Sequence, residues 1–292
     1  PFLQYLAHHS LYIYSPDALK KWGKDIVKHP VGTGPFKLDT WEPGVRVVLA
    51  RNDQYWGGVP KVRQAIYVPI IEAQARLSAI KTGEIDLTMD VPPDSLADLR
   101  RDPDVVVAET NSSAVWYVAL NTRHPALKDK RVRQALNYAV QKDAIIRDIL
   151  KGTAIVATTP LSPVYGAYHE DKTVRYPYDP EKAKALLKEA GFAGGFDVTF
   201  YVPESGSGMQ SPVEMGTVIQ ANLAAVGVRA KIQTMEWGAY LKKYLDAPDM
   251  AKMSWNPSIG DPDHMMYMLL SSDRFPPAFN AGFYQNPRVD EL

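Results

Sequence analysis

The second half of the chain alternates between two hydrophobic periods, one typical of helices and one typical of strands. Apolar residues recur at helical spacing over 130–150 and over 212–226, which predicts two amphipathic helices. Residues 196–202 are largely apolar and 228–234 alternate, which predicts two strands. Strand, helix and strand in succession indicate a parallel βαβ unit, and therefore an α/β fold.

In the first half of the chain, the hydrophobic pattern also predicts alternating strands and helices, in shorter segments. A Gly/Pro turn leads into a strand over 30–38, and 45–51 alternates as its hairpin-like partner. A helix over 72–82, with Gly83 at its C-terminus, is expected between two further strands. The pattern therefore predicts another parallel unit, with its strands at 66–70 and 84–87. A further buried strand is expected at 105–107.

Residues 115–122 separate the two halves. This run is apolar and aromatic, and it ends in the turn-formers Asn121 and Thr122. We expect it to be a strand that carries the chain across a cleft between two lobes, with the functional site in that cleft.

Helix starts are marked by residues that cap free backbone N–H groups. Asp129 and Asp179 each precede a predicted helix, and Ser211 with Glu214 has the spacing of a capping box. Asp263 is expected to cap a helix over 265–270.

Composition excludes several classes of function. The 292 residues contain 33 Lys+Arg and 33 Asp+Glu, so there is no electrostatic footprint for nucleic acid or an anionic membrane. The absence of Cys excludes disulfides, thiolate metal sites and Cys nucleophiles. There is no apolar run near the length of a membrane span. Both ends resemble cuts, so a fragment of a longer chain is expected.

Metal and phosphate motifs are weak. Asp261, Asp263 and His264 offer three ligands, but their spacing on a Pro turn favours helix capping over a metal site. The segment 32–35 lacks the Gly-Lys-Ser/Thr ending of a phosphate loop and enters a strand. Trp and Tyr residues near strand ends are more informative, because ligands of open α/β sheets bind outside the carboxyl ends of the strands. Core packing is the alternative for each of them.

Several stretches together resemble the peptide/nickel/opine class of solute-binding proteins, family 5, which serve ABC importers. The resemblance covers nearly the whole chain in order. It is carried by the stretches 30–38, 41–44, 51–58, 81–87, 120–122, 131–139, 178–183, 186–191, 220–228 and 235–241.

This resemblance implies a type II periplasmic-binding-protein fold, with two α/β lobes joined by hinge strands and no catalytic machinery. Residues 1–114 would be part of lobe I, 115–122 a hinge crossing strand, and 123–292 lobe II. It also implies a monomer that binds a small-molecule or peptide-like ligand without a cofactor. The protein would work with the membrane subunits of an ABC permease, in the periplasm or outside the cell, associated with the membrane through the permease or a lipid anchor.

The resemblance implies a binding site made of Trp116, Tyr117, Trp237, Trp255, Asn256 and Ser258. Peptide-binding members have an Asp where this chain has Ser258, and dipeptide-binding members have an Arg near Gly206. Both ion-pair partners are missing here, and an unpaired buried charge is destabilising by several kcal/mol. A neutral or differently charged ligand is therefore expected, such as a sugar, an opine-like molecule or a capped peptide.

Two rival functions remain at this point. A hydrolase acting on similar molecules would need an acid–base pair in the cleft, whereas the sequence offers scattered Asp and Glu residues. A signalling or chaperone-like binder would close on its ligand without delivering it to a permease.

Overall fold

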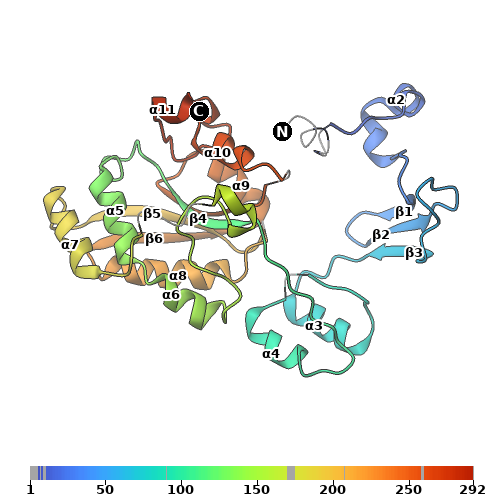
Figure 1. Cartoon of the computed structure of the whole chain (residues 1–292), viewed down its shortest axis with the longest axis horizontal. Helices are drawn as coiled ribbons and strands as arrows, with labels where there is room; N and C mark the ends of the chain where they lie inside the picture. The colour runs from blue at the N-terminus through green and yellow to red at the C-terminus, as the bar shows by residue number, and fades with distance from the viewer. Residues whose placement is uncertain are drawn as a thin grey trace. The chain divides into compact units, whose positions relative to one another are not determined.

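The computed structural model describes residues 6, 8, 11–89, 91–169, 175–206, 208–257 and 260–291. The chain divides into two compact units, Pro1–Thr88 and Met89–Leu292 (Figure 1). Each unit is described by itself.

The first unit contains a three-stranded antiparallel sheet with the order β1-β2-β3. Its strands are β1 (Phe36–Glu42), β2 (Arg46–Arg51) and β3 (Gln64–Tyr67). The predicted hairpin is therefore confirmed, and β3 lies close to the strand predicted at 66–70.

Helices flank this sheet in the sequence. They are α2 (Pro16–Trp22), the 3₁₀ helix η2 (Gly23–Lys28) and α3 (Ala73–Thr82). The side chain of Ser15 caps α2 by accepting a hydrogen bond from the N–H of Ala18, and Gly83 ends α3 in the left-handed conformation.

The parallel unit predicted for the first half is wrong. Residues 84–87 and 105–107 form no strand, and the side chain of Val106 is 92% exposed. A strand needs a neighbour that completes its backbone hydrogen bonds, and the described part of the chain between β3 and β4 provides none. Two short helices follow Pro92, η3 (Pro93–Ser95) and α4 (Leu96–Leu99).

The second unit is organised on a four-stranded sheet with the order β4-β7-β5-β6. The strands are β4 (Val115–Leu120), β5 (Phe196–Pro203), β6 (Val228–Met235) and β7 (Met250–Trp255). β5 is parallel to both β6 and β7, whereas β4 is antiparallel to β7. The βαβ unit predicted from the second half is confirmed.

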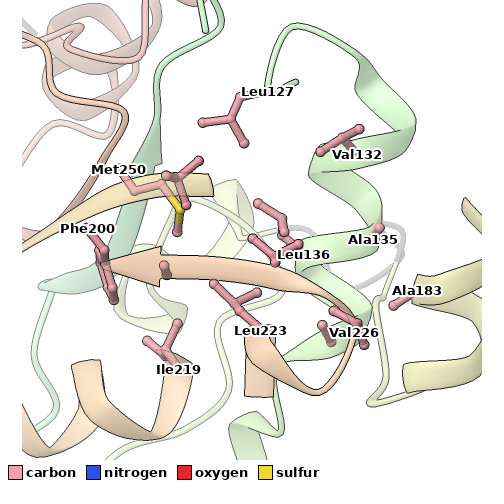
Figure 2. Close-up of a cluster of buried hydrophobic side chains, with 14 of the residues drawn as sticks. Leu127, Val132, Ala135, Leu136, Ala183, Phe200, Ile219, Leu223, Val226 and Met250 are labelled. Atoms are coloured by element: carbon pink, nitrogen blue, oxygen red, sulfur yellow. The ribbon is translucent and has the colours of Figure 1, made fainter. Parts of the chain in front are cut away.

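Helices cover both faces of this sheet, which makes three layers. The main core lies under α5 (Lys130–Ala139), α7 (Pro180–Glu189) and α8 (Pro212–Ala224). Figure 2 shows side chains from α5 and α8 meeting Phe200 and Met250 of the sheet. On the opposite face, α9 (Trp237–Leu245) packs Tyr240 and Tyr244 against the strands. The remaining elements are α6 (Lys142–Ala144), η4 (Ile145–Ile149), η5 (Pro163–Tyr168), α10 (Asp263–Leu270), η6 (Ser272–Arg274) and α11 (Pro287–Asp290).

The single helix predicted over 130–150 is interrupted. Val140 has an extended backbone, and the chain then continues as α6 and a π-helical turn, η4. The N–H of Gln141 donates a hydrogen bond to Oδ1 of Asn222 on α8, at 2.9 Å. A contact with another helix thus satisfies a backbone group that the break frees.

The predicted caps have mixed outcomes. Asp129 and Asp179 cap α5 and α7 through the N–H groups of Arg131 and Lys182. The capping box at Ser211 is wrong, because Ser211 has a left-handed backbone and its side chain makes no capping bond. Asp263 is the first residue of α10, and it is Asp261 that accepts a hydrogen bond from the backbone N–H of Asp263.

β7 is buried along nearly its whole length, including one lysine. Lys252 is 3% exposed, and burial lowers its pKa to about 7. Its ammonium lies 3.3 Å from the sulfur of Met209 and 5.7 Å from the ring of Trp116. Among the described residues, no carboxylate oxygen lies within 4.0 Å of this ammonium, the limit for an ion pair. The lysine is therefore a destabilising element of the core.

Gly195 provides a first test of the packing in this unit. A Cβ at this position would lie 1.8 Å from the carbonyl oxygen of Gly227, and the backbone has a φ of +74°. We expect Gly195→Ala to lower the free energy of unfolding by about 3 kcal/mol or more, since both strain and overlap oppose the side chain.

The matched control for this substitution is Gly194→Ala, because Gly194 has open space around its Cβ position. It should change the free energy of unfolding by less than about 1 kcal/mol. Urea denaturation of both variants makes the comparison, and equal effects would contradict the close approach of Gly195 and Gly227.

Replacement of Lys252 by Met provides a second test, because the two side chains have similar volumes. The folded-state pKa of Lys252 lies below the ordinary value of 10.5. Below pH 7 both folded and unfolded states carry the charge, so the full penalty applies. Between pH 7 and 10.5 the unfolded state binds the extra proton, so the stability of the parent protein rises with pH. We expect Lys252→Met to gain about 3 to 4 kcal/mol at pH 7.

This gain should shrink by about 1.4 kcal/mol for each pH unit between 7 and 10. Urea denaturation across this pH range measures the gain. Lys231→Met is the control, since Lys231 is an exposed lysine on β6 and should show no such pH dependence. A destabilised Lys252→Met variant would show that the ammonium has a compensating partner in the fold.

Candidate functional site

The carboxyl ends of the three parallel strands of the second unit lie at one edge of the sheet. Pro203 at the end of β5 pairs with Met235 at the end of β6. Trp255 at the end of β7 pairs with Val115 at the start of the antiparallel strand β4. The segments that leave this edge are 113–115, 204–211, 236–237 and 255–257, and we call them together the carboxyl edge. In open α/β sheets this is where ligands bind.

Trp237 lies at the carboxyl edge, where β6 joins α9. Glu236 caps α9 by accepting hydrogen bonds from the N–H groups of Gly238 and Ala239, which fixes the first turn. The indole stacks on the ring of Tyr240 with centroids 5.8 Å apart. The joint between strand and helix thus holds the Trp237 ring in one orientation.

Gly206 lies directly against the Trp237 ring. A Cβ at this position would be 2.4 Å from the indole, and the backbone has a φ of +111°. No side chain fits here unless the ring moves. The absence of an Arg at this position, noted in the sequence, therefore has a steric counterpart in the structure.

Trp255 is the last residue of β7 and is enclosed by two aromatic rings. The centroid of its ring lies 5.1 Å from that of Phe279 and 5.7 Å from that of His264. Its Nε1 is buried and has no hydrogen-bond partner among the described residues. Because a buried donor without an acceptor is costly, this N–H is a natural place for a ligand oxygen to bind.

Asn256 holds the ends of β4 and β7 together. Its Oδ1 accepts a hydrogen bond of 2.8 Å from the hydroxyl of Ser113, which is two residues before β4. The side chain therefore has a structural contact in addition to its place at the edge. Ser258, the next predicted site residue, lies outside the described residues.

Trp116 and Tyr117 point to opposite faces of the sheet, because successive strand residues alternate. Trp116 is partly buried and packs against the core under α5 and α8, beside the ammonium of Lys252. The Tyr117 hydroxyl lies 3.2 Å from that of Tyr244 under α9, and burial, followed by the Tyr244 charge, raises the pKa of Tyr117. The structure therefore does not bring these two residues to one surface.

The sequence-based reasoning missed Lys252. Its signal is a single lysine within the otherwise uncharged strand 250–255. The hydrophobic patterns of β4 and β5 predict strands. Residues 250–255 do not alternate between apolar and polar, so their pattern does not show which side chains a neighbouring loop covers.

Other features of the structure give no support for a metal site or a membrane span. Among the described ranges, no group of three or more His, Asp or Glu side chains is close enough to hold a metal ion. In the same part of the chain, no helix has the length and apolarity needed to cross a bilayer. A hollow of about 520 Å³ in the first unit is lined by Trp22, His29 and Trp41, and none of the predicted site residues lines it.

Comparison with known proteins places the chain among binding proteins. The family model for bacterial extracellular solute-binding proteins, family 5 (Middle), matches residues 1–276. The glutathione-binding protein GsiB of Escherichia coli O157:H7 is 32% identical over 299 residues, which cover 100% of this chain and 57% of GsiB. The chain therefore spans somewhat more than half the length of this relative.

Solved structures give the same result. The periplasmic binding protein DppA of Helicobacter pylori, in complex with the peptide STSA, matches with a TM-score of 0.91 and 32% identity, over 100% of this chain and 57% of DppA. The dipeptide-binding protein of Pseudoalteromonas sp. SM9913, in complex with Met-Leu, matches with a TM-score of 0.87 and 26% identity, over 99% of this chain and 58% of its own.

These matches confirm the fold class expected from the sequence, the type II periplasmic-binding-protein fold. The family model covers most of the chain, and the relatives match it from end to end. The chain belongs to family 5 of the bacterial extracellular solute-binding proteins.

Proposed function

We propose that the protein is the substrate-binding subunit of an ABC importer and captures a short peptide or peptide-like solute at the carboxyl edge of its second unit. The observation that carries this proposal is the pair Trp237 and Trp255, which follow parallel strands at the same edge. The part of the chain that the structure describes provides no acceptor for the buried indole N–H of Trp255. An acceptor on the solute, such as a peptide carbonyl, would accept a hydrogen bond from this N–H.

The spacing of the two tryptophans suits a short peptide. One strand, β5, separates β6 from β7, so the two strand axes are about 10 Å apart. An extended chain advances about 3.3 Å per residue, so a peptide of about three residues spans this distance. The indoles provide flat apolar surfaces, while the N–H of Trp255 provides one directional contact.

The relatives support a peptide-like solute. GsiB is named for glutathione, and the two similar structures contain the peptide STSA and the dipeptide Met-Leu. The expected sugar and opine-like ligands are less well supported by these relatives. The proposed setting is the periplasm or the cell exterior, with membrane association through the permease or a lipid anchor. In this proposal the protein acts as a monomer, and 115–122 is one of its hinge crossings.

The rival hydrolase has less support. An enzyme would need an acid–base pair beside the solute. Of the two acidic residues that adjoin the ends of β5 and β6, Glu236 is engaged in capping α9, and Glu204 is exposed. No catalytic residue is proposed, and the same binding measurements separate the two functions.

The first test is binding of glutathione, Met-Leu and Ser-Thr-Ser-Ala to the full-length protein, by calorimetry. The proposal expects at least one of them to bind and to be recovered unchanged, which mass spectrometry of the mixture checks. Binding of none would overturn the peptide assignment, and recovery of cleaved products would favour the hydrolase.

The second test is Trp255→Ala. Because the ring supplies both apolar surface and the free N–H, we expect affinity for the bound probe to fall by about 10-fold or more. The free energy of unfolding should fall by about 2 kcal/mol, since the side chain is only partly buried. Calorimetry and urea denaturation give the two values.

The control for this substitution is Tyr178→Ala, which removes an aromatic ring that is 43% exposed just before α7. Its affinity should equal that of the parent protein. If Trp255→Ala binds as tightly as the parent, the site lies elsewhere on the protein.

A further inference from the structure

The Trp255 ring is held in part by the loop 275–284, which lies between η6 and α11. The ring of Phe279 in this loop meets the indole edge-on, with centroids 5.1 Å apart and an angle of 69° between the planes. The other aromatic neighbour, His264, lies 5.7 Å away and is tilted by 35°. Edge-to-face contacts favour one ring orientation, so the direction of the Trp255 N–H depends on where the loop places Phe279.

Asn280 follows Phe279 and closes this loop from the inside. It is a polar residue that is only 1% exposed. Its Nδ2 donates hydrogen bonds to the carbonyl oxygens of Ser271, at 3.0 Å, and Tyr284, at 2.8 Å. Its Oδ1 accepts a third, of 3.1 Å, from the N–H of Tyr284. Because another path of the loop would leave these buried polar atoms unpaired, the Asn280 amide favours a single loop conformation.

The same loop is anchored to β4 and α9. The N–H and the hydroxyl of Thr122, two residues after β4, each donate a hydrogen bond of 2.9 Å to the carbonyl of Gly282. A Cβ at Gly282 would lie 3.1 Å from the carbonyl oxygen of Leu120, so the loop lies directly against the end of β4. From α9, the hydroxyl of Tyr244 donates to the carbonyl of Phe279 at 3.2 Å. The loop thus has a fixed base next to the strand.

Packing, rather than a hydrogen bond, sets the direction of the Trp255 N–H. Among the described residues, no acceptor forms a hydrogen bond with its Nε1. A donor that stays open for a solute cannot be oriented by a hydrogen bond of its own, so neighbouring side chains have to orient the ring. An indole that is oriented in advance binds more tightly, because less freedom is lost when the solute arrives.

We propose that Asn280 is a positioning residue for solute binding, and that it acts by holding Phe279 against Trp255. The inference rests on the proposed function and deepens it by naming a residue that shapes the solute site without touching the solute. Without the Asn280 amide, the loop loses three side-chain hydrogen bonds that fix its path. Phe279 then leaves its place beside the indole for part of the time, and the N–H no longer points in one direction.

The first test is a double-mutant cycle, measured by calorimetry on the full-length protein with whichever of glutathione, Met-Leu and Ser-Thr-Ser-Ala binds the parent. Asn280→Ala should weaken binding by about 5- to 20-fold, because the indole loses its fixed orientation. In a Trp255→Ala background, the same substitution should weaken binding by less than about 2-fold. A role of Asn280 in general stability would weaken binding by the same factor in both backgrounds, and that result would overturn the proposal.

Phe279→Leu is a second variant, which keeps Asn280 and removes the ring that contacts Trp255. It should show the same non-additivity with Trp255→Ala, and it decides the outcome if Asn280→Ala does not fold. The matched control is Asn286→Ala, because Asn286 also closes a turn of this region but caps α11 through the N–H of Arg288. Its affinity should equal that of the parent protein. Urea denaturation checks that each variant is folded under the conditions of the assay.

The orientation of Trp255 can also be followed without a solute. In a ¹H–¹⁵N spectrum of the full-length protein, the indole signal of Trp255 is the one that Trp255→Ala removes. Asn280→Ala should shift or broaden this signal and leave the other indole signals in place, whereas Asn286→Ala should change none of them. An unchanged Trp255 signal, or a change that spreads to all indole signals, would contradict a specific role of Asn280.

The outcomes separate the two proposals. If none of the probes binds the parent protein, the proposed function fails, and the indole signal alone decides whether Asn280 orients Trp255. If a probe binds but Asn280→Ala and Phe279→Leu bind it as tightly as the parent, the positioning role is overturned while the binding function stands.

Discussion

The structure of the second unit depends on the position of β7 between two different neighbours. β7 is parallel to β5 on one side and antiparallel to β4 on the other. This arrangement buries β7 on both faces and brings the start of β4 to the same edge as the ends of β5, β6 and β7. Trp255, Asn256 and Lys252 owe their places to this one strand. The order of the strands in the sheet therefore brings the residues of the candidate site together. No single sequence motif encodes this order.

The sequence predicted those elements whose signals are local. β4 has a clear apolar run between turn-formers, and Asp129 and Asp179 form the caps that their positions indicate. Prediction from the sequence was wrong where an element depends on a residue far away in the chain. Residues 84–87 have strand character but no described neighbour to pair with, and the helix after Asp129 breaks at Val140, where Asn222 of another helix completes the backbone.

The candidate site shows the same division. The aromatic residues near the strand ends were found from sequence, and Trp237 and Trp255 do lie at the carboxyl edge. The prediction that Trp116 and Tyr117 share one site did not take into account that successive strand residues face opposite sides of the sheet. Lys252 was passed over, because whether a lysine is buried depends on the loop that covers it, here through Met209.

Gly206 and Lys252 show where the second unit can and cannot hold a positive charge. The close approach of Gly206 to Trp237 leaves no room for a side chain, so the loop 204–211 cannot supply a cation at that position. The buried cation of this unit lies instead on β7, where the ammonium of Lys252 faces the Trp116 ring. A lysine, unlike an arginine, can lose its proton when buried, so the protein can carry this residue in its core with a smaller penalty once the pH rises above neutral.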